Sequence, residues 1–320
     1  MTLTACPPAL FLMGPTASGK TALCEKLVQA FDCEIISVDS AQIYKHLNIG
    51  TAKPDPDFLR RAPHHLIDII EPDTAYSVAQ FREDTLKLVT AIAARGRIPL
   101  LAGGTMMYFK SLIEGLNDLP AADPSTRAKI DAMALTQGWP GVHKTLHEVD
   151  PVTALRLAPN DQQRIQRALE IYLLTGKPLS EHLQSPRVNP FTFKPIQIAL
   201  NPSVRSVLHK RIQSRFDEML GCGLIDEVVG LRQRYPLLNA QMPSMRCVGY
   251  RQVWQYLDGN IDKVTLREQS IVATRQLAKR QMTWLRSLQN NPLNRLASFD
   301  CLDERLTDQV IHHVQQLLKA

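Results

Sequence analysis

Eight residues near the start of the chain have the types and spacing that hold a phosphate group. Residues 14–21 read GPTASGKT and match the pattern G-x-x-x-x-G-K-[ST]. In this pattern the backbone N–H groups of a glycine-rich turn and of a helix N-terminus surround a di- or triphosphate. Lys20 is expected to lie against the phosphates, and Thr21 is expected to bind Mg²⁺. The loop residues expected to bind the phosphates are Gly14, Thr16, Ala17, Ser18, Gly19, Lys20 and Thr21.

A second candidate group is the carboxylate of Asp39, which closes the apolar run EIISVDS at residues 34–40. In phosphate-loop enzymes that use ATP, an acid after a second apolar strand helps to hold Mg²⁺. Here Asp39 is followed by Ser40, Gln42 and Tyr44, a hydrogen-bonding cluster unlike a simple metal-holding loop. The alternative is that Asp39 only caps or orders a loop.

A third candidate is a basic segment near the C-terminus. The formal net charge is +6, and residues 243–295 carry nine Lys or Arg residues against three acids, a difference that equals the whole excess. Tyr250, Trp254, Tyr256 and Trp284 lie among these cations. Cations interleaved with aromatic rings suit a sugar-phosphate chain with unstacked bases. A solvated basic helix face is the alternative.

The composition is that of a folded, enzyme-sized protein. With 320 residues and 44% hydrophobic content, the chain can form a substantial core. No window approaches 18 uninterrupted apolar residues and no secretory signal is evident, so we expect a cytoplasmic protein without membrane contact. The six cysteines never fall at C-x-x-C spacing, which argues against a zinc site or a redox pair.

Strands and helices alternate over the first hundred residues, and they position the phosphate loop and Asp39. An apolar run at residues 10–13 precedes the phosphate loop, and an amphipathic helix with Leu23, Leu27 and Phe31 follows it. Next come EIISVDS, a helix at VAQFREDTLKLVTAIAARG and a third strand at IPLLAGGT. This order predicts an α/β fold with a parallel sheet flanked by helices. Ligands gather at the carboxyl ends of such strands, so residues 14–21, 39–44 and 103–105 should meet at one pocket.

The remainder of the chain predicts two further parts. Residues 116–190 are expected to form a mostly helical insertion domain between two strands of the core, because FKPIQIALN at residues 193–201 reads as another buried strand. From Val204 onward the chain is expected to be helical throughout, with GCGLIDEVVGLRQRY as one amphipathic helix. Residues 1–115 and 191–320 then make up the phosphate-loop core with a helical C-terminal region.

Eight segments of the chain resemble the successive motifs of the bacterial tRNA dimethylallyltransferases, also called isopentenyl-tRNA transferases. They occur in family order across nearly the whole chain: GPTASGKT (14–21), DSAQIY (39–44), GTAKP (50–54), HHLID (64–68), GGTMMY (103–108), QRIQRALEIYLLTGKPLS (163–180), MRCVGYRQ (245–252) and RQLAKRQMTWLR (275–286). The zinc finger of some eukaryotic members is absent, in agreement with the cysteine spacing.

The resemblance implies transfer of a dimethylallyl group from dimethylallyl diphosphate to the exocyclic N6 of the adenine immediately 3′ of the tRNA anticodon. The phosphate loop would then hold the diphosphate leaving group, with Mg²⁺ at Thr21. Asp39 would be the base that removes the N6 proton. The resemblance further places Thr105 in the same pocket and has Arg127 contact the RNA or the diphosphate. It also suggests that Lys53 meets phosphate, whereas a structural hydrogen bond is equally open for His65.

Chemistry on a stacked base requires that the base be flipped out. By the family pattern, the tRNA anticodon loop would be contacted by four segments, and we expect the protein to act as a monomer. The expected contacts in these four segments, together with Thr105 and Arg127, are Asp39, Ser40, Ala41, Gln42, Thr105, Arg127, Gln163, Arg164, Ile165, Gln166, Arg167, Arg246, Cys247, Val248, Gly249, Tyr250, Arg251, Lys279, Arg280, Gln281, Trp284 and Arg286.

Two other classes of function remain open from the sequence. One is an ATP-dependent small-molecule kinase, which predicts ATP consumption without RNA. The other is a non-catalytic RNA-binding protein that keeps the phosphate loop as a structural switch, which predicts RNA affinity without product. Neither accounts for both the DSAQIY cluster and the basic aromatic segment.

Overall fold

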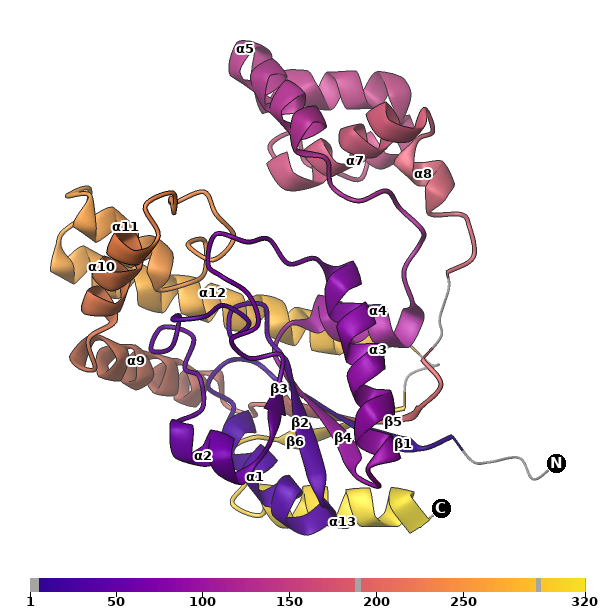
Figure 1. Ribbon diagram of the computed structural model, residues 1–320, viewed down its shortest axis with the longest axis vertical. Coiled ribbons are helices and arrows are strands. Elements are labelled where there is room, and N and C mark those ends of the chain that lie inside the picture. The colour runs from indigo at the N-terminus through magenta and orange to yellow at the C-terminus, as the bar shows by residue number, and fades with distance from the viewer. Residues whose placement is uncertain (1–5, 188–190, 292–294, 320) are drawn as a thin grey trace. The chain divides into compact units, whose positions relative to one another are not determined.

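The computed structural model describes residues 6–187, 191–291 and 295–319 (Figure 1). Contacts between residues divide the chain into two compact units. The first unit combines Met1–Leu112 with Phe191–Ala320, and the second is Ile113–Pro190.

The first unit is built on a six-stranded parallel sheet with the strand order β3-β2-β4-β1-β5-β6. The strands are β1 (Pro8–Met13), β2 (Cys33–Val38), β3 (His64–His65), β4 (Ile98–Gly103), β5 (Lys194–Asn201) and β6 (Leu296–Asp300). All six residues of β2 are buried, as expected for a parallel strand with both faces covered. The predicted α/β class with a parallel sheet flanked by helices is confirmed.

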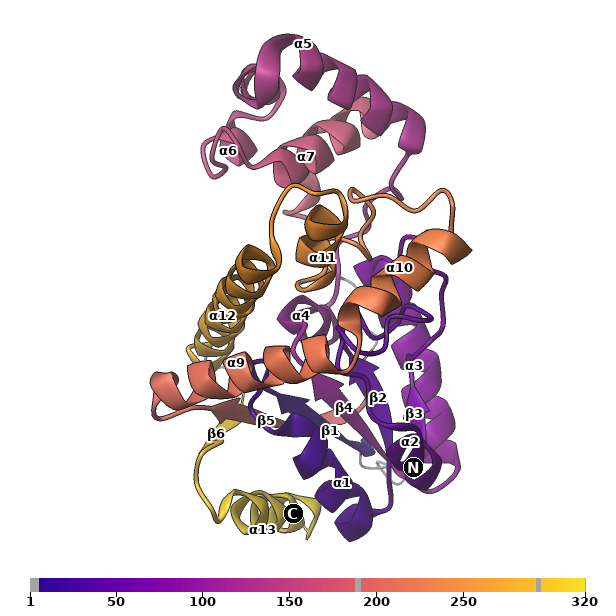
Figure 2. The ribbon, with the colours of Figure 1, turned by 90° about the vertical axis from the view of Figure 1, so that its left-hand side faces the viewer.

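Helices cover both faces of this sheet (Figure 2). On one face, α1 (Lys20–Phe31) and α13 (Leu306–Lys319) share a core with Leu10 and Leu12 of β1. On the opposite face, Phe11 of the same strand lies 5.5 Å from Phe109 of α4 (Met106–Glu114), measured between ring centroids. The helix α3 (Val78–Ala94) also contacts β2 and β4. The short helix α2 (Pro56–Arg61) follows the loop after β2.

The C-terminal helices lie beyond the ends to which the strand arrows point (Figure 2). They are α9 (Arg205–Gly221), α10 (Leu224–Arg234), α11 (Tyr250–Leu257) and α12 (Lys263–Gln289). A second hydrophobic core joins Ile43 and Leu47, in the loop after β2, to Phe216 of α9 and Val228 of α10. The loop that carries Asp39 is thereby packed against these helices.

One expectation for the C-terminal region was wrong. The chain is not helical throughout after Val204, because β6 adds a parallel strand beside β5. This five-residue strand is only half-buried and has no continuous apolar run from which it could have been predicted. The amphipathic segment GCGLIDEVVGLRQRY is present as α10, which begins after Gly223, whose φ of 94° is left-handed. The two-residue strand β3 at the edge of the sheet was not expected.

The second unit is helical. It contains α5 (Pro124–Val149), α6 (Pro151–Ala154), α7 (Gln162–Thr175) and α8 (Leu179–His182). The Asp161 side chain caps the start of α7, and Gly176, with a φ of 70°, follows its last residue. A kink in α5 falls at Gly138, whose φ is 69°. In the described parts of the chain, no helix combines the length and apolar character that membrane spanning requires.

Candidate active site

The phosphate loop connects β1 to α1 at the carboxyl edge of the sheet. Ala17 has a φ of 62° and Gly19 a φ of 83°, so two residues of the turn adopt the left-handed conformation. Alternation of left- and right-handed residues turns successive N–H groups to one side and forms an anion-binding concavity. The Lys20 ammonium donates hydrogen bonds to the carbonyl oxygens of Gly14, at 2.9 Å, and of Pro15, at 2.7 Å. Lys20 is thereby held against its own loop.

The electrostatics of Lys20 favour an anion beside it. Burial lowers the pKa of Lys20 to about 8, and the Asp39 carboxylate offsets part of this shift. A poorly solvated ammonium gains more from an incoming phosphate than an exposed one does. Within the described residues, the hydroxyl of Ser18 is buried and has no hydrogen-bond partner. Ser18 lines the main cavity described below, so this loop can supply a hydroxyl to an anion as well as backbone donors.

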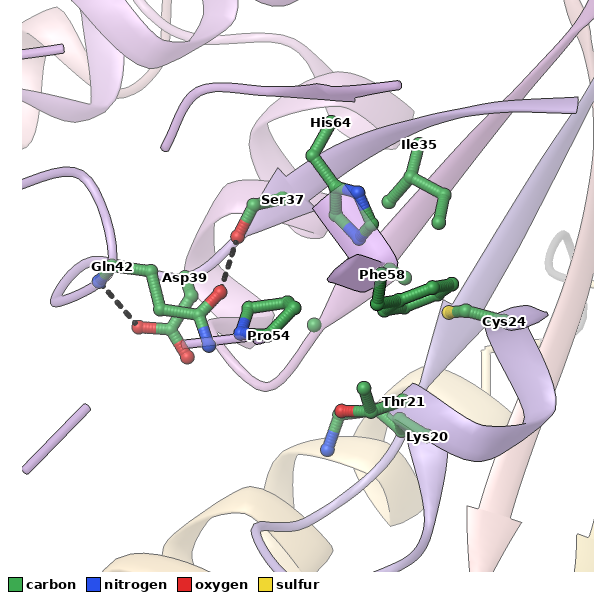
Figure 3. A pocket seen from close by; sticks show the side chains of 12 residues that line it. Lys20, Thr21, Cys24, Ile35, Ser37, Asp39, Gln42, Pro54, Phe58 and His64 are labelled. Atoms are coloured by element: carbon green, nitrogen blue, oxygen red, sulfur yellow. Dashed lines mark hydrogen bonds between the residues drawn. The ribbon is translucent and has the colours of Figure 1, made fainter. Parts of the chain in front are cut away.

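Asp39 follows directly on β2 and lies across a small pocket from Lys20 and Thr21 (Figure 3). Its Oδ1 atom accepts hydrogen bonds from the backbone N–H groups of Ala41, at 2.8 Å, and Gln42, at 3.4 Å. These bonds fix the orientation of the carboxylate and leave Oδ2 as a proton acceptor. Asp39 therefore orders its loop, as the alternative interpretation proposed, and at the same time faces the phosphate loop.

Gln42 and Thr105 hold this loop in place. The Gln42 side chain accepts a hydrogen bond from the Ser37 hydroxyl and donates to the carbonyl oxygens of Thr51 and Ala52. Thr105, at the end of β4, accepts a hydrogen bond from the Ser40 backbone N–H at 3.1 Å. The three loops that were expected to converge after β1, β2 and β4 do so.

A cavity of ≈ 860 Å³ opens beside these loops. It is lined by the phosphate loop, by Asp39, Ala41 and Gln42, and by residues from the C-terminal helices. Predicted residues Cys247, Val248 and Gln281 also lie on its wall. Burial raises the pKa of the Cys247 thiol to about 12, so this side chain is a neutral thiol at physiological pH and not a thiolate nucleophile.

Three cations on the cavity wall were not predicted from the sequence: Lys210, Arg211 and Arg215 of α9. Burial lowers the pKa of Arg215, and the Asp39 and Glu218 carboxylates act in the opposite direction. A signal existed in the sequence, because apolar residues at 208, 212 and 216 mark the buried face of a helix and the cations flank that face. What periodicity does not reveal is that this helix passes beside the phosphate loop.

Several predicted contact residues are placed elsewhere. Ile165 and Tyr250 are each 0% exposed, so the structure contradicts direct contact between these side chains and RNA. Ile165 belongs to the core of the second unit, and the Tyr250 hydroxyl donates to Glu227 at 2.5 Å. Gly249 is also buried.

Lys53 and His65 have structural partners. The Lys53 ammonium donates to the Tyr44 carbonyl oxygen at 2.6 Å and pairs with Asp68, and only 5% of the side chain is exposed. Lys53 therefore holds the loop after β2 together and is not among the residues that line the cavity. His65 lies 2.7 Å from the carboxylate of Glu34, which is the structural hydrogen bond left open above.

In the second unit, two of the residues that were predicted to contact RNA, Arg127 and Arg167, pair with the buried carboxylate of Glu170. Arg127 binds it through Nε and Nη2 at 2.8 and 3.1 Å, and Arg167 binds it at 2.8 Å. Gln166 donates to Asp131, and Arg164 pairs with Asp161. Gln163 and Arg164 are exposed. The proposed RNA contacts of Arg127 and of residues 163–167, other than Ile165, stay predictions.

In the first unit, the predicted cations of the C-terminal region are on the surface. Arg246, Arg251, Lys279, Arg280 and Arg286 are all exposed. Trp284 is half-buried, with the Lys110 ammonium 5.6 Å from its ring centroid. The predicted contacts of these residues with RNA stay predictions.

Oxygen ligands for Mg²⁺ are available beside the phosphate loop. Thr21, Ser37, Asp39 and Gln42 line the small pocket shown in Figure 3. Hydroxyl, carboxylate and amide oxygens suit Mg²⁺, which usually takes one or two carboxylates together with water and phosphate oxygens. In the described residues no group of three or more His, Cys, Asp or Glu side chains forms a metal site. The residues present thus fit a Mg²⁺ ion that is held jointly with a bound phosphate.

A parallel sheet with a glycine-rich loop after β1, and a cation-lined cavity against that loop, define a fold of the P-loop type. The model of the IPP transferase family matches residues 42–288, and the chain belongs to this family. It is 55% identical to a tRNA dimethylallyltransferase of Nitrosospira multiformis, over 95% of this chain and 92% of that one.

Solved structures agree with this placement. A tRNA isopentenylpyrophosphate transferase of Bacillus halodurans is 34% identical, with a TM-score of 0.67 over 98% of this chain and 95% of that one. A eukaryotic dimethylallyltransferase acting on tRNA is 25% identical, with a TM-score of 0.78 over 98% of this chain and 80% of that one.

Proposed function

We propose that this protein transfers the dimethylallyl group of dimethylallyl diphosphate to the exocyclic N6 of the adenine 3′-adjacent to the anticodon of tRNA. The bond between the allylic carbon and the diphosphate oxygen breaks, the bond between that carbon and N6 forms, and N6 loses a proton. The products are N6-(dimethylallyl)adenosine and diphosphate. The observation that carries the proposal is one cavity that joins the phosphate loop to Asp39 and to the C-terminal helices, in a chain of the IPP transferase family.

The leaving group is the diphosphate, and its growing negative charge is the main barrier to its departure. Lys20, the backbone N–H groups of residues 19–21 and the Arg215 guanidinium would be the cationic and donor groups around it. Preorganised donors of this kind act strongly because they need no reorganisation as charge develops. When bound at Thr21, Mg²⁺ would neutralise further charge on the diphosphate.

The cavity wall also suits the carbon chain of the donor. Val207, Ile212, Phe216, Met219, Val248 and Leu277 line the cavity beside the charged groups. An apolar wall next to an anion-binding loop favours a small apolar chain that is joined to a diphosphate. The family membership argues against both a kinase and a non-catalytic RNA-binding protein.

Asp39 is the proposed base. The lone pair of adenine N6 is delocalised into the ring, so the nitrogen attacks well only as its proton is removed. The carboxylate is fixed by two backbone hydrogen bonds to Oδ1 and lies across the small pocket from Lys20 and Thr21 (Figure 3). The phosphate loop, the base and the cavity all belong to the first unit of one chain, which favours action as a monomer. We place this reaction in the cytoplasm, where tRNA occurs.

Transfer is tested directly with isotopically labelled dimethylallyl diphosphate and bulk tRNA. We expect label in RNA, recovered as a modified adenosine, and we expect the reaction to stop with EDTA and to resume with Mg²⁺. ATP should neither replace the donor nor be consumed. Hydrolysis of ATP without labelled RNA would favour the kinase, and RNA binding without label would favour the non-catalytic protein.

The base is tested by Asp39→Asn, which keeps the shape and the acceptor atom for the Ala41 and Gln42 N–H groups. We expect single-turnover transfer to slow by at least about a hundredfold, the scale of a lost general base, with tRNA affinity nearly unchanged. Near-normal single-turnover transfer by this variant would remove Asp39 from the role of base.

A further inference from the structure

Gln281 connects the C-terminal helix α12 to the phosphate loop. Its side chain is only 9% exposed, and its two polar atoms serve two different loops of the sheet edge. Oε1 accepts a hydrogen bond from the Thr16 backbone N–H at 2.9 Å, and Nε2 donates to the Gly104 carbonyl oxygen at 3.0 Å. The family resemblance counts Gln281 among the RNA contacts, but both of its polar atoms are directed at the protein's own backbone.

The contact with Gln281 leaves no room for a side chain at Gly104. A Cβ atom added at Gly104 would lie 2.3 Å from Nε2 of Gln281, a distance that real Cβ contacts do not show. Any side chain at position 104 would therefore push the Gln281 amide out of place. The glycine and the glutamine fit one another, and the loops after β1 and β4 are tied through them to α12.

The loop that Gln281 holds needs external support. Ala17 is not a glycine, yet it has a φ of 62°, a conformation that costs about 1–3 kcal/mol and persists only where the surroundings enforce it. Ala17 packs against Leu208 and Ile212 of α9 and against Ala278 of α12. Gln281 lies on α12 just beyond Ala278 and fixes the neighbouring Thr16. Packing and hydrogen bonding thus act from the same helix on the same turn.

We infer that Gln281 is a positioning residue for the diphosphate site, which holds the phosphate loop in its anion-binding conformation and does not bind RNA. This inference rests on the proposed function. Lys279 and Arg280 precede Gln281 on α12 and are exposed, so one helix carries the predicted RNA contacts and the support of the diphosphate loop. Donor binding then depends on a residue of the RNA-contacting helix.

The test is Gln281→Met, which keeps most of the volume and removes both hydrogen bonds. The matched control is Gln276→Met on the same helix, where the glutamine is exposed. We measure the affinity of the protein for inorganic diphosphate with Mg²⁺, the affinity for tRNA, and the KM for dimethylallyl diphosphate. Loss of two buried hydrogen bonds should weaken diphosphate binding and raise the donor KM roughly tenfold, with tRNA affinity within about twofold of the parent. The control should change none of them.

A second variant approaches the same contact from the other side. Gly104→Ala should displace the Gln281 amide and weaken diphosphate binding in the same direction, and the double variant should be little worse than either single one. Weaker tRNA binding with unchanged diphosphate affinity in Gln281→Met would make Gln281 an RNA contact and overturn the inference. Equal losses for both ligands would also overturn it, because they would reflect general damage. Both binding measurements are made without transfer, so they remain decisive if the proposed reaction itself were not observed.

Discussion

The Lys20 ammonium gives the proposed diphosphate site a pH dependence that an ordinary lysine would not have. Burial lowers the pKa of Lys20 from 10.5 to about 8, and the nearby Asp39 carboxylate only partly opposes this. The protonated form attracts the diphosphate and the neutral amine does not. Donor capture by the free protein should therefore be lost as pH rises through about 8.

The size of the effect follows from the fraction of Lys20 that is protonated. With a pKa of about 8, about nine-tenths is charged at pH 7 and about one-tenth at pH 9. The kcat/KM for dimethylallyl diphosphate should fall about tenfold over this range and about tenfold again by pH 10. A lysine with the ordinary pKa of 10.5 would lose almost nothing by pH 9.

The assay is the pH dependence of kcat/KM for the donor at a fixed, saturating tRNA concentration, because this ratio reports ionisations of the protein before the donor binds and of the free donor. The control variant is Lys20→Arg, whose guanidinium stays charged over the whole range. Its rate is expected to be lower because the fork cannot reproduce the two carbonyl contacts, but its profile should be flat above pH 7. A decline that comes from the donor or from another group of the protein would persist in this variant.

Two results would refute this reasoning. A flat profile for the parent protein up to pH 9 would mean that Lys20 keeps an ordinary pKa and is better solvated than its position indicates. The same decline in Lys20→Arg and in the parent would assign the ionisation to another group.

Two further predictions concern charge in other parts of the first unit. Replacing Lys279 and Arg280 together with alanine should flatten the slope of log tRNA affinity against log salt by roughly one to two units, whereas replacing Arg60 and Arg61 should change it far less; equal changes would reduce the basic segment to a solvated surface. Glu34→Gln should lower the free energy of unfolding at pH 7 by about 2–3 kcal/mol in urea titrations, because hydrogen bonds from Arg95 lower the Glu34 pKa to about 2 and this stabilisation exists only while the carboxylate is charged. The difference from the parent should shrink as the pH falls below 4.5, and a constant difference would assign it to packing.

The phosphate loop and the position of Asp39 could be predicted because both are local properties of the chain. Gly19 and Lys20 belong to a pattern whose geometry is set within eight residues, and Asp39 follows a strand with buried residues at every position. The convergence of these loops follows from the rule that parallel strands end at one edge of the sheet. No information from distant parts of the chain was needed.

The roles of Arg215 and Tyr250 could not be predicted because they depend on how distant elements pack. Arg215 reads as one cation of an amphipathic helix, and it reaches the cavity only because α9 packs on α12 through Leu208 and Ala278. Tyr250 lies in a basic segment rich in aromatic residues and was expected to contact RNA. Instead its ring packs against Gly50, where an added Cβ atom would lie 2.5 Å from Cε2 of the ring.

In the proposed reaction, the Asp39 carboxylate also influences the charge of the cations around it. Its carboxylate acts to raise the pKa of both Lys20 and Arg215, so it helps to keep both groups charged before the reaction. When Asp39 accepts the N6 proton it loses one negative charge, and cleavage of the carbon–oxygen bond adds one negative charge to the departing diphosphate. The net charge of the cavity is then the same before and after transfer. Since separated charge is costly in a poorly solvated site, a base placed beside the diphosphate cations lets the charge move over a short distance without leaving them unpaired.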